Sequence, residues 1–145
     1  MKPAAIEISS DPARIDADVV FGFLTTSYWA TGRPRAVVEH SIRHSLCFGA
    51  YDGASQVGFG RIITDQAVFA YLADVFVIEA YRGRGIGRAL VAAMLADPRL
   101  VTVQQFFLRT RDAHGVYEPL GFEPVARPEE LMSLGARKGS RPDLA

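Results

Sequence analysis

The chain has 145 residues, 49% of them hydrophobic and 22% charged, so it can form one domain with a sizeable core and is too apolar to be disordered. Its 16 basic and 16 acidic residues cancel, which removes any overall attraction to nucleic acid or to an anionic membrane. No segment approaches the ~20 apolar residues of a membrane span, and no apolar leader precedes Glu7, so we expect a cytoplasmic protein. The single cysteine, Cys47, excludes an internal disulfide framework and a multi-cysteine zinc site, and its apolar neighbours favour a buried thiol.

The first third of the chain predicts a strand followed by two helices. AAIEIS (4–9) alternates as a short strand does, and SSDP (9–12) offers a helix cap followed by proline. Apolar residues at helical spacing predict a helix over 15–26, and SYWATGRP (27–34) is a loop by its glycine and proline. A second helix is expected from 34 to about 44.

The central part of the chain predicts three strands. Apolar and β-branched runs cover 46–51, 56–63 and 67–77, and turn residues separate them at 52–53 and 64–66. Because both connections are short, we expect the three strands to pair antiparallel.

The remaining part predicts helices and strands in alternation. Apolar residues at every fourth position predict an amphipathic helix that begins at Ile86 and ends near Asp97. A strand over 101–110, a short helix over 112–120 and a further strand over 121–125 follow.

The tail from about residue 127 has no clear pattern. Residues 131–134 could form an edge strand, and residues 135–145 are polar and glycine-rich enough to fray. Without an internal repeat or a linker-like change of composition, we expect a single domain over 1–145.

The sequence VFVIEAYRGRGIGRALVAAML (75–95) places a glycine turn between a strand and a helix. The start of a helix exposes unpaired N–H groups at the positive end of its dipole, and glycine lets an anion approach them closely, so the turn predicts a phosphate site. Neither the dinucleotide fingerprint nor the Walker A pattern fits this turn. A connector with solvated arginines and no ligand is the alternative. The turn carries three glycines and three arginines: Gly83, Gly85, Gly87, Arg82, Arg84 and Arg88.

Two motifs resemble those of the GNAT superfamily of acyl-CoA-dependent N-acyltransferases. Arg82, Gly85 and Gly87 match the family's signature of Arg or Gln, two residues, Gly, one residue, and Gly or Ala. Downstream, YEPLGF (117–122) matches its Y-x-x-x-G-F pattern. The resemblance covers about residues 4–125 and implies an α/β (α+β) fold, with a mixed, mainly antiparallel sheet whose fourth and fifth strands splay apart, flanked by about four helices.

The resemblance also implies a donor and a mechanism. Acetyl-CoA would donate an acetyl group directly to a neutral amine in a ternary complex, without a metal. Phe76 and Val77 would hold the pantetheine arm, and Tyr117 would act as the acid near the sulfur. Because Pro119 disfavours helical geometry at its predecessor, the short helix is expected to end early and to shift Tyr117. The backbone from Arg82 or Gly83 onward would hold the diphosphate, through Gly83, Arg84, Gly85, Ile86, Gly87 and Arg88.

No motif marks the general base. Asp74 interrupts an apolar strand, where a charge is costly without a function or a partner, so it could take a proton through water or hold an ammonium group. An ion pair with Arg61 on the neighbouring strand is an equal alternative, and Glu79 is the second candidate for the base.

The acceptor pocket has equally few markers. Tyr28 and Trp29 lie in a loop that overhangs this pocket in the family's fold, with core packing as an equal alternative. His40 and His44 have the i, i+4 spacing of metal ligands, but we expect them to be solvated opposite the apolar face of their helix. His114 is expected on a helix face.

The sequence therefore predicts an N-acetyltransferase that acts on a primary amine of a small molecule or peptide. A non-catalytic acyl-CoA-binding sensor is the alternative, and a nicotinamide-dependent enzyme is a weaker one. We expect no nucleic-acid or membrane partner, and a homodimer is possible.

Overall fold

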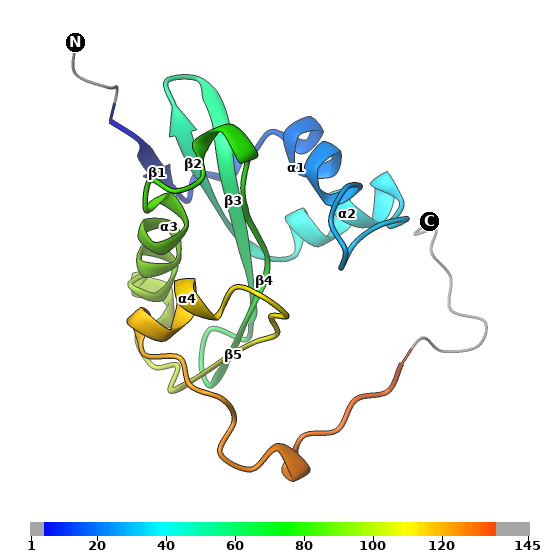
Figure 1. The fold of residues 1–145 in the computed structure, drawn as a ribbon, viewed down its shortest axis with the longest axis vertical. Helices are drawn as coiled ribbons and strands as arrows, with labels where there is room; N and C mark the ends of the chain where they lie inside the picture. Colours follow the sequence, from blue (N-terminus) through cyan, green and yellow to red (C-terminus); the bar gives the residue numbers. More distant parts are fainter. Residues whose placement is uncertain (1–4, 136–145) are drawn as a thin grey trace.

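The computed structural model describes residues 5–135, which form a five-stranded sheet between two pairs of helices. Figure 1 shows α3 and α4 on one face of the sheet and α1 and α2 on the other. The strands follow one another in the order β1-β2-β3-β4-β5, antiparallel except for the parallel pair β4 and β5. In chain order the elements are β1 (Glu7–Ser9), α1 (Ala17–Leu24), α2 (Arg35–Arg43), β2 (Leu46–Asp52), β3 (Ser55–Thr64), β4 (Phe69–Val77), α3 (Ile86–Leu95), β5 (Gln105–Leu108) and α4 (His114–Tyr117).

Each face of the sheet has its own core. The α3 side chains Leu90, Val91 and Met94 pack on one face with Phe48 and Ile62 of the strands. On the other face, the core joins α1 and α2 to β2, β3 and β4 through Val20, Leu24, Val38, Cys47, Phe59 and Phe76. Residues at alternate strand positions therefore serve different cores, because successive side chains of a strand point to opposite faces.

The helix starts follow from local hydrogen bonds. Asp11 caps a 3₁₀ turn at Pro12–Arg14, so the cap expected at 9–12 does not begin the first helix. Asp16 caps α1 instead and accepts hydrogen bonds from the N–H groups of Asp18 and Val19. The helix predicted over 15–26 is therefore present with shorter bounds.

A bulge in β4 and the short length of β5 open the sheet. Phe59 pairs with Phe76 and Arg61 with Ala73, so Gly60 alone faces two residues of β4. One of these, Asp74, has φ 54°, a left-handed conformation that aspartate tolerates better than most residues. Beyond the bulge, β4 has no partner on its other side within residues 5–135, because β5 pairs only with Phe69–Leu72. The splay of the fourth and fifth strands is thus confirmed.

The strand predicted over 101–110 is shorter than expected. A 3₁₀ turn at Pro98–Leu100 continues into a turn in which Val103 is buried, and β5 starts only at Gln105. The helix predicted over 112–120 ends at Tyr117 and tightens into a 3₁₀ turn at Glu118–Leu120. That turn contains Pro119, and the α-helix ends early as expected. Glu118 nevertheless keeps helical backbone angles (φ −56°, ψ −44°), so the expected loss of helical geometry before Pro119 is wrong.

The strand predicted over 121–125 is wrong. Gly121 has φ 97° and closes the preceding turn, and the N–H of Phe122 donates to the carbonyl of Tyr117, which directs Phe122 onto the Tyr117 ring. Pro124 has no N–H to offer to a neighbouring strand. Residues 131–134 also form no strand, so β5 is one edge of the sheet within the described residues, and β1 is the other. Residue 4 of the first predicted strand and residues 136–145 lie outside the described residues.

Within residues 5–135, no helix has the length and hydropathy needed to cross a membrane.

Candidate functional site

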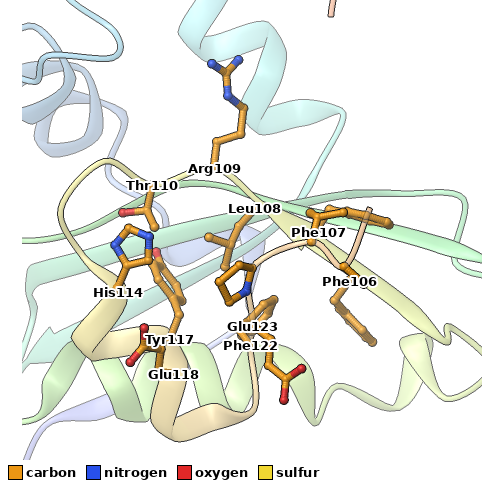
Figure 2. A pocket seen from close by; sticks show the side chains of 13 residues that line it. Phe106, Phe107, Leu108, Arg109, Thr110, His114, Tyr117, Glu118, Phe122 and Glu123 are labelled. Carbon is orange, nitrogen blue, oxygen red and sulfur yellow. The ribbon is translucent and has the colours of Figure 1, made fainter. Parts of the chain in front are cut away.

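The opening between β4 and β5 leads into a cavity of about 730 Å³. Residues 71–75, in the middle of β4, form its floor, and the segment that follows β5 forms one wall. The loop between α1 and α2 contributes Tyr28, Trp29 and Arg33, and α4 contributes Tyr117. A second cavity of about 500 Å³ lies between β5, α4 and residues 122–126 (Figure 2). Tyr117 lines both cavities.

The glycine turn has the geometry of an anion site. Gly83 and Gly85 have φ 77° and 76°, and a Cβ added at either position would meet no atom within 4 Å. Gly85 is the N-cap residue of α3, and no side chain caps the helix there. Among residues 5–135, nothing accepts a hydrogen bond from the amides of residues 83–88, and the first helical bond runs from Ala89 to the Gly85 carbonyl. Six consecutive N–H groups are therefore free at the positive end of the helix.

The amide of Arg82 does not belong to this set, because it donates to the carbonyl of Glu79 at 3.1 Å. The guanidinium of Arg82 is also directed back to the sheet, where Nε donates to the carbonyl of Val77 at 3.1 Å. Arg84 lies over the ring of Tyr81 at 4.9 Å, whereas the exposed Arg88 forms no ion pair within the described residues. The free amides thus begin at Gly83.

The two β4 residues expected to hold the pantetheine arm, Phe76 and Val77, point their backbone N–H groups in opposite directions. The N–H of Ile78 donates to the carbonyl of Val57 on β3 at 2.9 Å. Because backbone groups of successive strand residues point to opposite edges, Val77 turns its N–H toward the opening, and Phe76 turns its own toward β3. The Phe76 side chain is buried and stacks on Phe23 with ring centroids 4.0 Å apart. The geometry favours Val77 over Phe76 as a backbone partner for a ligand.

Tyr117 lies at the end of α4, in the wall that the two cavities share. Its ring meets Phe122 edge-on at 5.8 Å, and Figure 2 shows it beside His114, with Thr110 close by. Burial, with a smaller contribution from Tyr28, raises the pKa of Tyr117 to about 12. The phenol is therefore neutral and a hydrogen-bond donor throughout the physiological pH range.

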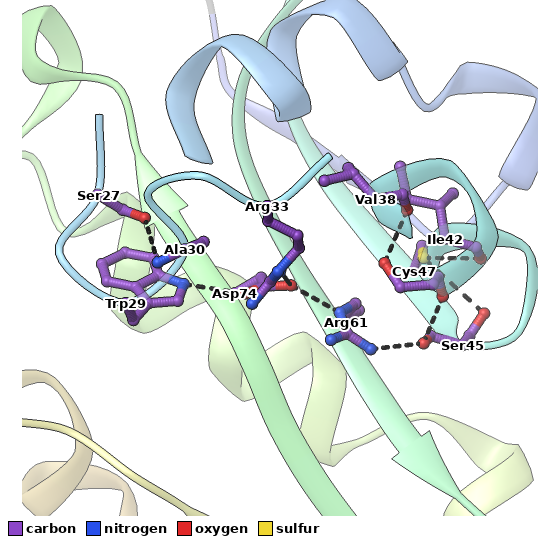
Figure 3. A network of polar contacts seen from close by, with 11 residues as sticks. Ser27, Trp29, Ala30, Arg33, Val38, Ile42, Ser45, Cys47, Arg61 and Asp74 are labelled. Atoms are coloured by element: carbon purple, nitrogen blue, oxygen red, sulfur yellow. Dashed lines mark hydrogen bonds and ion pairs between the residues drawn. The ribbon is translucent and has the colours of Figure 1, made fainter. Parts of the chain in front are cut away.

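Asp74 is the centre of a buried polar network (Figure 3). Its Oδ2 accepts from Arg33 at 2.9 Å and from Arg61 at 2.7 Å, and its Oδ1 accepts from the Trp29 indole N–H at 2.8 Å. Arg61 also donates to the hydroxyl of Ser45 at 3.0 Å. Burial opposes ionisation, but the hydrogen bond and charge of Arg61, the charge of Arg33 and the Trp29 bond outweigh it, so the pKa of Asp74 is lowered. The ion pair with Arg61 that the sequence offered as an alternative is confirmed.

Tyr28 and Trp29 both line the larger cavity. The hydroxyl of Tyr28 accepts from the backbone N–H of Arg111 at 3.2 Å, and the Arg111 guanidinium stacks on the Tyr28 ring at 3.7 Å. Trp29 meets Tyr28 edge-on at 5.1 Å and Phe23 at 6.3 Å. These contacts join the loop between α1 and α2 to the segment after β5 and form the rim of the cavity.

Several other candidates lie elsewhere. Glu79 is exposed on the glycine-turn side and lines neither cavity. His40 of α2 and His44, the C-cap residue of that helix, stack at 4.3 Å, and no group of three metal-ligating side chains occurs among residues 5–135. His114 lines the smaller cavity. Burial raises the pKa of the Cys47 thiol to about 11, which makes it a poor nucleophile.

Sequence reasoning missed three arginines of the larger cavity: Arg33, Arg109 and Arg111. Each lies in a loop, where no periodic pattern marks the direction of a side chain. For Arg33, the sequence signal was its position in the same loop as Trp29, which was already a candidate for the acceptor pocket.

Three comparisons agree on the family. The model of the acetyltransferase (GNAT) domain matches residues 43–124, more than half of the chain. A crystal structure of a GNAT-family protein from Xanthomonas campestris pv. campestris has 40% sequence identity and a TM-score of 0.88, over 93% of this chain and 96% of that one. A Clostridium acetobutylicum protein described as an acetyltransferase, solved with acetyl-CoA, shares the fold at 12% identity and a TM-score of 0.67, over 90% of this chain and 96% of that one.

A curated relative from Gibberella zeae, whose name calls it an acetyltransferase, is 32% identical in an alignment of 101 positions that covers 56% of this chain. The chain spans about 57% of that relative's length. The family model matches, a related structure covers nearly the whole chain, and β4 and β5 splay apart beside a glycine turn. The chain therefore belongs to the GNAT acetyltransferase family.

Proposed function

We propose that this protein transfers an acetyl group from acetyl-CoA to a primary amine of a small molecule or peptide, by direct attack within a ternary complex. The observation that carries the proposal is the run of six free amides at residues 83–88, next to the opening between β4 and β5. Family membership supports the same donor.

The residues of the opening fit coenzyme A along its length. The amides of Gly83 to Arg88 and the positive end of α3 suit a diphosphate, and the open space around Gly83 and Gly85 lets it approach. The backbone of Val77, at the unpaired edge of β4, suits an extended arm with amide groups. Bound there, acetyl-CoA supplies an acyl carbonyl activated by its thioester.

Tyr117 assists the departure of the thiolate. A thiol has a pKa of about 8.5, well below the value of about 12 to which burial raises the Tyr117 phenol. Complete proton transfer from Tyr117 to the sulfur is therefore unfavourable, and Tyr117 acts by donating a hydrogen bond to the developing negative charge.

Asp74 positions the acceptor side of the site. Its two oxygens already accept three hydrogen bonds, and its lowered pKa makes it a weak base. It holds Trp29 in place at the rim of the cavity and Arg33 at its base. The neutral amine attacks the thioester carbonyl, the C–S bond breaks as the C–N bond forms, and the proton released from nitrogen passes to water in the open cavity while the sulfur leaves as thiolate. The reaction accelerates with pH as more of the amine becomes neutral.

A thiol-release assay with a panel of amines tests the proposal. Release of coenzyme A that depends on both acetyl-CoA and an amine, with the acetylated amine found by mass spectrometry, supports it. Binding of acetyl-CoA without release by any amine would favour the sensor alternative. Stabilisation by NADH but not by acetyl-CoA would favour the nicotinamide alternative.

Three expectations from the sequence stay predictions: a single domain, a cytoplasmic location and a homodimer. The unpaired outer edge of β5, within the described residues, offers one place where a second copy could pair.

A further inference from the structure

The larger cavity is rich in positive charge. Among the described residues, its lining contains four arginines and two aspartates, and no lysine, histidine or glutamate. The whole chain is electrically balanced, so this excess is local to the cavity. A cationic lining attracts anions and disfavours polycationic acceptors.

The base of the cavity carries one net positive charge. Arg33 and Arg61 share a single carboxylate oxygen of Asp74, at 2.9 and 2.7 Å. The three side chains are 25%, 12% and 3% exposed, respectively, so two positive groups and one negative group are withdrawn from water together. Two adjacent guanidinium groups repel each other unless a second anion is near, and burial strengthens this repulsion.

Both guanidinium groups can still bind an anion. A guanidinium has five N–H donors. Within the described residues, Arg33 uses one in a hydrogen bond to Asp74, and Arg61 uses two, toward Asp74 and Ser45. Planar guanidinium groups suit the paired oxygens of a carboxylate or phosphate.

At the rim, the guanidinium of Arg109 takes part in no hydrogen bond or ion pair within residues 5–135, although it lines the cavity. Arg111 is held against Tyr28 with its charge at the same rim. The cavity thus has a cationic base and a cationic rim.

This anion site is separate from the glycine turn. The lining of the cavity includes β4 only as far as Val75, and no residue from 76 to 88 belongs to it. An anion bound by Arg33 and Arg61 is therefore not the diphosphate held by the amides of 83–88. It belongs to the other substrate.

We propose that the acceptor is a primary amine that also carries an anionic group, a carboxylate or a phosphate, bound by Arg33 and Arg61 with Arg109 at the rim. The inference rests on the proposed acetyl transfer. The aromatic rings of Trp29 and Tyr28, 40% and 47% exposed, leave room at the same rim for an apolar or aromatic part of the acceptor.

Matched pairs of amines test the proposal by steady-state kinetics. Phenylalanine is compared with phenethylamine, and O-phosphoethanolamine with ethanolamine. All rates are measured at one pH and corrected for the neutral fraction of each amine. We expect at least one anionic member to have a kcat/KM about tenfold or more above its uncharged partner, as one charge-assisted hydrogen bond would give. The pair with the larger ratio identifies carboxylate or phosphate. Equal values in both pairs, or higher values for the uncharged members, would overturn the inference and leave acetyl transfer intact.

Arginine variants localise the effect. Arg33→Gln removes one guanidinium but leaves Asp74 bonded to Arg61 and Trp29, so the fold is retained. We expect the KM of the preferred anionic amine to rise about tenfold, with the KM values of its uncharged partner and of acetyl-CoA unchanged. Arg127→Gln is the matched control, because Arg127 pairs only with the exposed Glu130 within the described residues. An equal rise for charged and uncharged amines would contradict anion binding by Arg33.

Calorimetry separates this inference from the proposed function. With saturating coenzyme A present and no acetyl donor, no turnover occurs, and the binding of each amine is measured alone. Tighter binding of an anionic amine, weakened by Arg33→Gln, supports the anion site even if no amine is acetylated. Absence of that preference for all anionic amines would refute it.

Discussion

Replacing Asp74 by asparagine removes the negative charge that Arg33 and Arg61 share and keeps the size of the side chain. Asparagine tolerates the left-handed backbone at this position, where φ is 54°. The variant therefore isolates the loss of charge. Alanine removes the hydrogen bonds as well and adds the strain of a left-handed residue, about 1 kcal/mol.

The structure sets the expected loss of stability. Breaking a fully buried ion pair costs about 3–5 kcal/mol. The asparagine oxygen can still accept from Trp29 or an arginine, and the Arg33 side chain is 25% exposed, so we expect about 2–3 kcal/mol for Asp74→Asn. With a urea m-value of about 2 kcal/mol/M, the midpoint of unfolding falls by about 1–1.5 M. The midpoint of Asp74→Ala should lie lower still, by about a further 0.5 M.

Kinetics on the same variant decides the role of Asp74. A positioning residue lowers kcat by less than about tenfold at saturating amine, whereas loss of a general base costs about 10²–10⁴-fold. Urea unfolding and thiol release on one preparation give both numbers. Two results together would refute the positioning role and restore Asp74 as the base. The urea midpoint would be unchanged within about 0.2 M, roughly the error of such a measurement, and kcat would fall more than about a hundredfold.

Three further predictions concern the donor side, the acid and the pH. Gly85→Ala introduces strain at φ 76° without a steric contact, so it should lower the free energy of unfolding by about 1 kcal/mol and weaken coenzyme A binding in calorimetry. The control Gly22→Ala, in α1 and equally free of contacts, should slightly stabilise the protein and leave coenzyme A binding unchanged. Tyr117→Phe keeps the ring contact with Phe122 and should lower kcat about 10–100-fold without changing the KM for acetyl-CoA; an unchanged kcat would eliminate the hydrogen bond to sulfur. Because the folded-state pKa of Asp74 lies below its ordinary value of 3.8, its stabilising effect is complete above about pH 4 and disappears as the pH falls through the lower folded value. The difference in urea midpoint between wild type and Asp74→Asn should therefore shrink below pH 4, and a constant difference down to pH 2 would show that the charge of Asp74 does not cause it.

Much of the fold could be predicted because its signals are local. Apolar runs in β2, β3 and β4, tight turns between them, and the fourfold spacing of Ile86, Leu90 and Met94 each reflect which residues are buried. The glycine turn could be recognised because left-handed backbone at Gly83 and Gly85 favours that residue type. These features depend on a few neighbouring residues.

The errors arose where packing overrides local preference. Val101 and Val103 resemble strand residues, yet Val101 is 84% exposed and Val103 is buried from within a turn, so β5 begins only at Gln105. In 121–125, the contact of Phe122 with Tyr117 and the proline at 124 prevail over the strand preference of Phe and Val.

The acceptor side could be predicted least. The bulge at Asp74 depends on the register between β3 and β4, which the sequence of β4 alone does not determine. Arg33, Arg61 and Arg109 come from a loop, a strand and a second loop, and only the folded chain brings them to one cavity. The charge of that cavity is therefore a property of the tertiary structure.

The central claim is that the amides of residues 83–88 bind the diphosphate of coenzyme A. Amide chemical shifts and hydrogen exchange of ¹⁵N-labelled protein, measured with saturating coenzyme A and with pantetheine, test it residue by residue. We expect coenzyme A to shift and protect the amides from Gly83 to Arg88, and pantetheine, which lacks the diphosphate, to affect Val77 but not the turn. If saturating coenzyme A leaves the amides of 83–88 unshifted and unprotected, the diphosphate binds elsewhere and the proposed donor site is wrong.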